Sequence, residues 1–188
     1  MAIKTFSAGE VLTSSDTNTY LANSGLVYVT SGSLATGTTN LQGIFSSTYN
    51  NYRITLDTLN MSSSSVCAFR MLSGASADGT AQYYWAFSGI DVTGVSTNDY
   101  GQTSSTGRTG FIATATGVLG SVVFDIFKPF IAQATFITSQ VSMYDTRFGV
   151  RNGAAQHNVA TSYDGIQLST YGGGNMTGTY TVYGYRKA

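Results

Sequence analysis

The stretch "NYRITLDTL" (residues 51–59) alternates apolar and polar side chains with a period of two. This alternation is typical of a strand that lies on a core with one face and meets solvent with the other. The side chains predicted to face the core are Tyr52, Ile54 and Leu56, and those predicted to face outward are Arg53, Thr55 and Asp57. The stretch "SVVFDIF" (121–127) repeats the pattern, with Val122, Phe124 and Ile126 inward and Asp125 outward.

Similar segments, rich in β-branched and aromatic residues, follow one another from residue 26 onward, separated by clusters of Gly, Ser, Asn and Asp. We expect strands over 26–31, 41–46, 51–58, 66–72, 82–88, 110–115, 118–127, 132–142, 154–160, 164–170 and 178–186. No helical segment alternates with them, so the sequence predicts an all-β, antiparallel β-sandwich over residues 26–188, and a jelly-roll-like arrangement is our first choice.

The leader "KTFSAGEVLTSSDTNTYLANSGL" (4–26) differs from this pattern. Its "TSSD" places a hydroxyl residue, Thr13, three positions before Asp16, which is a helix-start signature, and a helix of about two turns is expected to end near Gly25. So short a helix cannot bury its own apolar stripe. We therefore interpret residues 1–25 as an N-terminal attachment segment, whose candidate contact residues are Val11, Leu12, Tyr20 and Leu21.

Charge is scarce, because Asp, Glu, Lys and Arg make up 10% of the chain and acids and bases balance at nine each. The chain contains 23 Ser and 27 Thr, so we expect its polar surface to be mostly uncharged. The arginines are dispersed and matched in number by acids, so no basic patch is expected and nucleic acid is not an expected partner. Low charge favours self-association, and we expect a homo-oligomer. No apolar run reaches the length of a signal peptide or a membrane span, which predicts that the protein is made in the cytosol.

Groups for catalysis are few: one histidine, His157, one cysteine, Cys67, one glutamate, Glu10, and scattered aspartates. No nucleophile-elbow motif or metal-ligand spacing is present, so we expect no enzyme activity, no cofactor and no metal site. His157 is predicted to face solvent. Cys67 is predicted to be a buried, inert thiol.

The polar segment 96–110, "STNDYGQTSSTGRTG", is predicted to be a long loop, and it carries Tyr100 and Arg108. Exposed aromatic rings with uncharged polar neighbours suit sugar recognition, so Tyr100 and Arg108 are the candidate ligand residues and a surface glycan is the candidate ligand. The alternative is an ordinary surface loop.

The leader "FSAGEVLTSSDTNTYLAN" (6–23) resembles a segment that opens many tailed-bacteriophage structural proteins, with Ser14 where that family usually has Ala. The segments "FSSTYNNYRITL" (45–56), "FRMLSGAS" (69–76) and "GTYTVYGYRK" (178–187) are similar to parts of a β-sandwich module of such proteins. The resemblance implies a virion component, commonly trimeric, that joins other virion proteins through its N-terminal segment. A short tail fibre or receptor-binding appendage is the first expectation, a head (capsid) decoration protein is the alternative, and a carbohydrate-binding module of a larger assembly is a distant one. No catalytic or binding residue follows from the resemblance.

Overall fold

In the computed structural model, residues 7–11, 13–14, 25–113, 118–145 and 147–186 are described. These residues form strands and connecting turns. The strands are β1 (Leu26–Ser33), β2 (Thr38–Leu41), β3 (Asn51–Met61), β4 (Ser65–Ser73), β5 (Ser76–Ala77), β6 (Tyr83–Asp91), β7 (Ser96–Ser104), β8 (Gly107–Ala113), β9 (Val118–Phe127), β10 (Gln133–Asp145), β11 (Arg147–Thr161), β12 (Gly165–Tyr171) and β13 (Met176–Tyr185). The predicted all-β class is confirmed.

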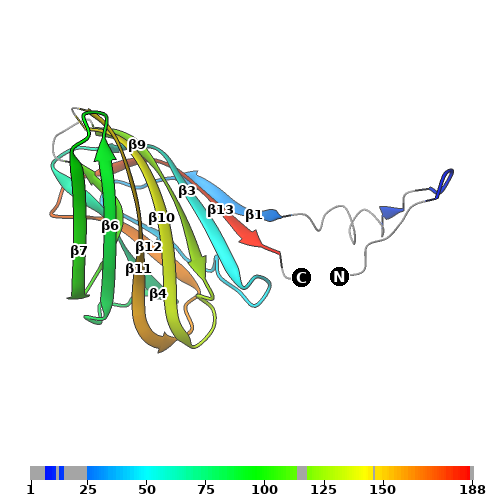
Figure 1. The fold of residues 1–188 in the computed structure, drawn as a ribbon. Coiled ribbons are helices and arrows are strands. Elements are labelled where there is room, and N and C mark those ends of the chain that lie inside the picture. The colour runs from blue at the N-terminus through cyan, green and yellow to red at the C-terminus, as the bar shows by residue number, and fades with distance from the viewer. Residues whose placement is uncertain (1–6, 12, 15–24, 114–117, 146, 187–188) are drawn as a thin grey trace.

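Two sheets carry these strands. The larger has eight strands in the order β1-β13-β3-β9-β10-β11-β6-β7, and the smaller has the order β2-β12-β4-β5, with β8 also paired to β4. Every pair among the described strands is antiparallel. Figure 1 shows β4 and β12 running behind β10 and β11, so the sheets form two layers.

The core lies between the layers and contains the side chains that the alternation predicts. Tyr52, Ile54 and Leu56 of β3 are fully buried, and Val122, Phe124 and Ile126 of β9 are at most 1% exposed. They join one cluster with residues of the smaller sheet, which include Cys67, Phe69, Met71, Ile166 and Leu168. The predicted burial of Cys67 is confirmed, and burial raises the pKa of its thiol to about 11.

Several predicted elements differ from the structure. Segment 154–160 was expected to be a strand, but β11 covers Arg147–Thr161 and so begins seven residues earlier, and the short strand β5 was not predicted. Segment 41–46 was expected to be a strand, but β2 covers Thr38–Leu41 and the chain then turns. Segment 96–110 was expected to be a loop, but it forms β7 and the start of β8. β7 is the edge strand of the larger sheet and pairs on one side with β6. Its polar side chains are exposed or half-buried, except for the buried Asp99.

The predicted leader helix lies outside the described residues, apart from Thr13 and Ser14. The jelly-roll-like arrangement stays a prediction, as does the division at residue 25. The first strand begins at Leu26.

Candidate functional site

The outward face of the eight-stranded sheet carries a cross-strand row of six residues, formed because the strand registers place them directly opposite one another. Its members, from β3 to β7, are Arg53, Asp125, Thr138, Ala154, Ala86 and Tyr100. The neighbouring row, in the same strand order, is Thr55, Val123, Gln140, Asn152, Ser88 and Asn98. We call the surface over these two rows the cross-strand groove.

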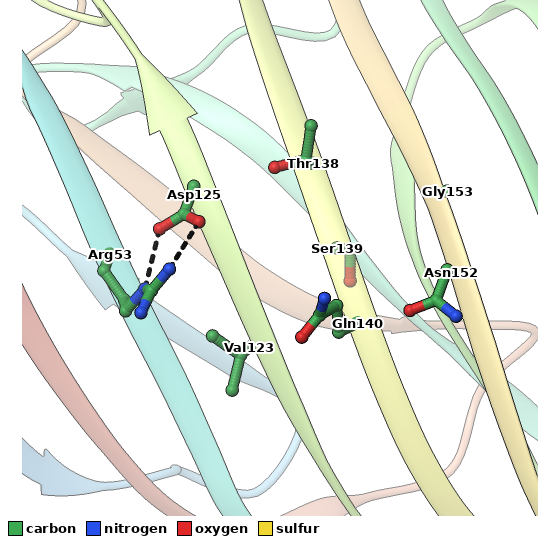
Figure 2. A pocket seen from close by; sticks show the side chains of 8 residues that line it. All are labelled: Arg53, Val123, Asp125, Thr138, Ser139, Gln140, Asn152 and Gly153. Carbon is green, nitrogen blue, oxygen red and sulfur yellow. Dashed lines mark hydrogen bonds and ion pairs between the residues drawn. The ribbon is translucent and has the colours of Figure 1, made fainter.

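Two adjoining hollows lie along this groove, with volumes of about 290 and 360 Å³. The first is lined by Arg53, Asp125 and Gln140, and the second by Ser88, Asn98 and Tyr100; Asn152 and Gly153 line both. Figure 2 shows the first hollow, with Gln140 and Asn152 adjacent on β10 and β11. The shared residues join the hollows into one depression across six strands.

At one end of the groove, Arg53 and Asp125 form a two-pronged ion pair, in which Arg53 Nε and Nη2 donate to Asp125 Oδ1 and Oδ2, each at 2.8 Å. The Tyr185 hydroxyl also donates to Asp125 Oδ1, at 2.6 Å. Burial opposes ionisation of Asp125, but the bonds from Arg53 and Tyr185 outweigh it and hold the pKa of this carboxyl below its usual value. Burial, with the neighbouring carboxylate, raises the pKa of Tyr185 to about 12. This end of the groove is therefore polar, and its two opposite charges neutralise each other.

The predicted ligand residues Tyr100 and Arg108 lie on different surfaces. Tyr100 is 81% exposed and lines the groove. Arg108 instead donates to Asp99 Oδ1 at 2.9 Å and lies 4.9 Å from the centre of the Trp85 ring and 4.8 Å from that of Tyr171. Since Tyr171 belongs to the smaller sheet and Asp99 to the larger, this packing makes Arg108 a link between the sheets.

Gln140 and Asn152 were not singled out from the sequence. The alternation in "ITSQVSM" (137–143) does predict that Gln140 faces outward, as Thr138 does. It cannot show that Asn152 lies opposite Gln140, because that depends on the register between two strands.

Of the four predicted attachment residues, only Val11 lies within the described residues. Val11 is 79% exposed, beside a turn in which the Glu10 N–H donates to the Ser7 carbonyl at 3.0 Å. Leu12, Tyr20 and Leu21 lie outside the described residues.

The prediction that His157 faces solvent is wrong. The side chain is fully buried, and its ring stacks on Tyr83 at a centroid distance of 3.9 Å. The Tyr163 hydroxyl donates its one proton to Asp78 Oδ2 at 2.6 Å, so His157 Nε2, which is 2.8 Å from the Tyr163 oxygen, is the donor in that contact. The same nitrogen lies 3.1 Å from Asp78 Oδ2. Asp78 thus supplies the carboxylate of a polar cluster with His157 and Tyr163.

Burial opposes ionisation of Asp78, but hydrogen bonds from Thr80 and Tyr163 outweigh it and hold the pKa of its carboxyl well below the usual range. Burial, with the nearby carboxylate, raises the pKa of Tyr163. The side chains of His157 and Tyr163 are fully buried in the core. We therefore assign the cluster a structural role.

Large apolar side chains gather at the end of the same face where β10 meets β11. Leu119, Tyr144 and Phe148 lie opposite one another on adjacent strands, as do Val150 and Ile90. We define the apolar end patch by these exposed residues together with Val92 and Val95. A third hollow of about 340 Å³ lies within it, lined by Leu119, Tyr144 and Phe148 among others.

Within the described residues, no group of three or more His, Cys, Asp or Glu side chains is placed to hold a metal ion. The same part of the chain contains no helix that is long and apolar enough to cross a membrane. Compared with known protein-family models, curated proteins and solved structures, the chain shows no match.

Proposed function

We propose that this protein is a non-enzymatic structural component of a tailed-phage virion, acting as a short tail fibre or receptor-binding appendage. In this proposal several copies, most simply three, associate, and residues 1–25 join them to other virion proteins. A jelly-roll-like sandwich and a short helix in the leader complete the proposal. The resemblance of residues 6–23 to phage leaders supports the virion assignment.

The observation that carries the assembly role is the apolar end patch. Its side chains are 37% to 68% exposed although they are Leu, Ile, Val, Phe and Tyr, and the registers make them contiguous. Contiguous exposed apolar surface marks interaction sites. The patch residues carry no charge and the chain has a net charge of zero, so copies of this chain meet on the patch without electrostatic repulsion.

The association is tested with Tyr144→Lys/Phe148→Lys, which places two charges on directly opposed, exposed positions. Light scattering should report a multiple of 19.8 kDa for the native chain and 19.8 kDa for the double variant. Gln42→Lys, an exposed position beside the smaller sheet, is the matched control and should remain oligomeric. A monomeric native chain, or a variant that associates equally well, would refute this surface.

The virion role is tested by mass spectrometry and cryo-electron microscopy of purified particles. Density at the tail supports the appendage, and density on the head surface supports the decoration alternative. Absence of the chain from particles, with its presence in the lysate, rules out both.

A further inference from the structure

We propose that the cross-strand groove binds an extended, uncharged oligosaccharide that lies across the strands from Arg53 to Tyr100. The inference deepens the receptor-binding role and rests on the proposed function for its biological use, but the binding itself is a property of this chain. It moves the ligand site away from Arg108, whose guanidinium is engaged between the sheets.

The charge of the groove selects a neutral ligand. The Arg53 guanidinium is neutralised by Asp125 through two parallel bonds, and Tyr185 adds a third bond to the same carboxylate. Displacing this pair with a phosphate or sulfate would leave Asp125 beside the incoming anion, which is unfavourable. Polyanionic chains are therefore poor ligands, while sugar hydroxyls can donate to Asp125 and accept from Arg53 without breaking the pair.

The middle of the groove offers free hydrogen-bonding groups. Gln140 and Asn152 are exposed and directly opposite each other, and Thr138 lies one row away. Within the described residues, the side chains of Gln140, Asn152 and Thr138 form no hydrogen bond with another side chain. On the smaller sheet, by contrast, the Gln167 amide donates to the Asn40 Oδ1 at 3.0 Å. An amide pair that both donates and accepts matches the mixed donor and acceptor character of hydroxyls.

The shape of the groove fits a chain rather than a single small ring. From β3 to β7 there are five inter-strand steps of ~4.8 Å, or about 24 Å. Ala86 lines the second hollow and lies opposite Ala154, so the side chains of this part of the row are short and leave room above the sheet. Tyr100 ends the row with an 81% exposed ring, a flat apolar face against which a sugar ring can pack.

A peptide is the less favoured occupant. Extended peptides that bind sheets pair with the free backbone of an edge strand. The groove crosses six strands at their side chains, and β3 and the four strands between β3 and β7 are each paired on both sides. The free backbone edge of β7 lies only at the end of the groove and runs along that strand, so a ligand lying across the strands cannot pair with it over its length.

The test is isothermal titration of the full chain with linear neutral oligosaccharides of glucose, galactose, mannose and N-acetylglucosamine, and with a heparin oligosaccharide as the anionic comparison. Gln140→Ala/Asn152→Ala should weaken neutral-sugar binding at least tenfold, the loss expected from two hydrogen bonds. The matched control is Asn40→Ala/Gln167→Ala, which removes an equivalent opposed amide pair from the smaller sheet. It should bind as the native chain does, and Tyr100→Ala should also weaken binding.

Both double variants must keep the native circular dichroism spectrum, which their solvent-facing positions favour. Tighter binding of heparin than of every neutral sugar, no binding of any neutral sugar, or equal losses in the two double variants would overturn the inference. A chain that is present in particles but fails these titrations refutes the groove and leaves the virion role standing. A chain that binds sugars but is absent from particles refutes the virion role and leaves the groove as a sugar-binding site.

Discussion

Replacing Tyr163 by Phe removes one oxygen from the buried cluster of His157, Asp78 and Tyr163. That oxygen donates to Asp78 Oδ2 at 2.6 Å and accepts from His157 Nε2 at 2.8 Å. A hydrogen bond to a charged group contributes about 1.5–3 kcal/mol, and His157 keeps its 3.1 Å contact to Asp78, so we expect a loss of about 2 kcal/mol in the free energy of unfolding. For a chain of this size, that loss lowers Tm by about 4–8 °C.

The effect should depend on pH with a definite sign. The native pKa of Asp78 lies below the ~3.9 of an unfolded aspartate, so the ionised carboxylate stabilises the fold fully above about pH 4. This contribution disappears as the pH falls toward the native pKa. The difference between native chain and Tyr163→Phe should therefore be constant from pH 7 to pH 5 and shrink in more acidic solution.

Urea unfolding at several pH values measures the loss in the free energy of unfolding and its dependence on pH. Tyr100→Phe is the control, because its ring is 81% exposed and the change should stay within about 0.5 kcal/mol. A Tyr163→Phe loss no larger than that of Tyr100→Phe, or one that does not change in acid, would refute the role assigned to the Tyr163–Asp78 bond.

Three further outcomes are expected. The Cys67 thiol, buried and with its pKa raised to about 11, should react with a thiol reagent at pH 8 only after unfolding, and rapid labelling of the native chain would contradict its burial. Arg108→Ala should lower the free energy of unfolding in urea by about 2 kcal/mol, because it leaves the Asp99 carboxylate, 9% exposed, without its cation. Ordinary surface substitutions change this free energy by at most ~0.5 kcal/mol, so a loss smaller than that would mean that the pair is dispensable. A chain that starts at Gly25 should keep its β-type circular dichroism and most of its Tm, yet fail to join particles; unfolding would place the leader in the core, and normal incorporation would place the docking surface on the sandwich.

The alternation of side chains was enough to predict the class and most strands. In β9 the predicted bounds, 118–127, agree with the structure, since Val122, Phe124 and Ile126 alternate without interruption. The method failed at β7, where "STNDYGQTS" has the composition of a turn. An edge strand needs few apolar residues, so its composition carries little strand signal.

The sites were harder to predict because they depend on contacts between residues far apart in the chain. His157 is surrounded by polar neighbours in the sequence "GAAQHNVA", which suggested exposure, but its carboxylate partner Asp78 lies 79 positions away. The groove depends likewise on the register of β10 with β11, which brings Gln140 opposite Asn152. Neither the pairing nor the register is encoded in a local pattern.

The three surfaces that the proposals use lie at different positions along the strands of the eight-stranded sheet. Strand β1 begins at Leu26, which pairs with Tyr185. Tyr185 pairs with Asn51, and Asn51 pairs with Phe127, the last residue of β9. The chain therefore enters this sheet at the end where β9 finishes. The apolar end patch lies at the opposite end, because Leu119 is near the start of β9, and the cross-strand groove runs between the two. Leu26, the first strand residue, is therefore separated along the strands from both the groove and the patch. Since Gln140 and Asn152 share no position with Tyr144 and Phe148, the proposed sugar binding and the proposed association can be tested by separate substitutions on one face.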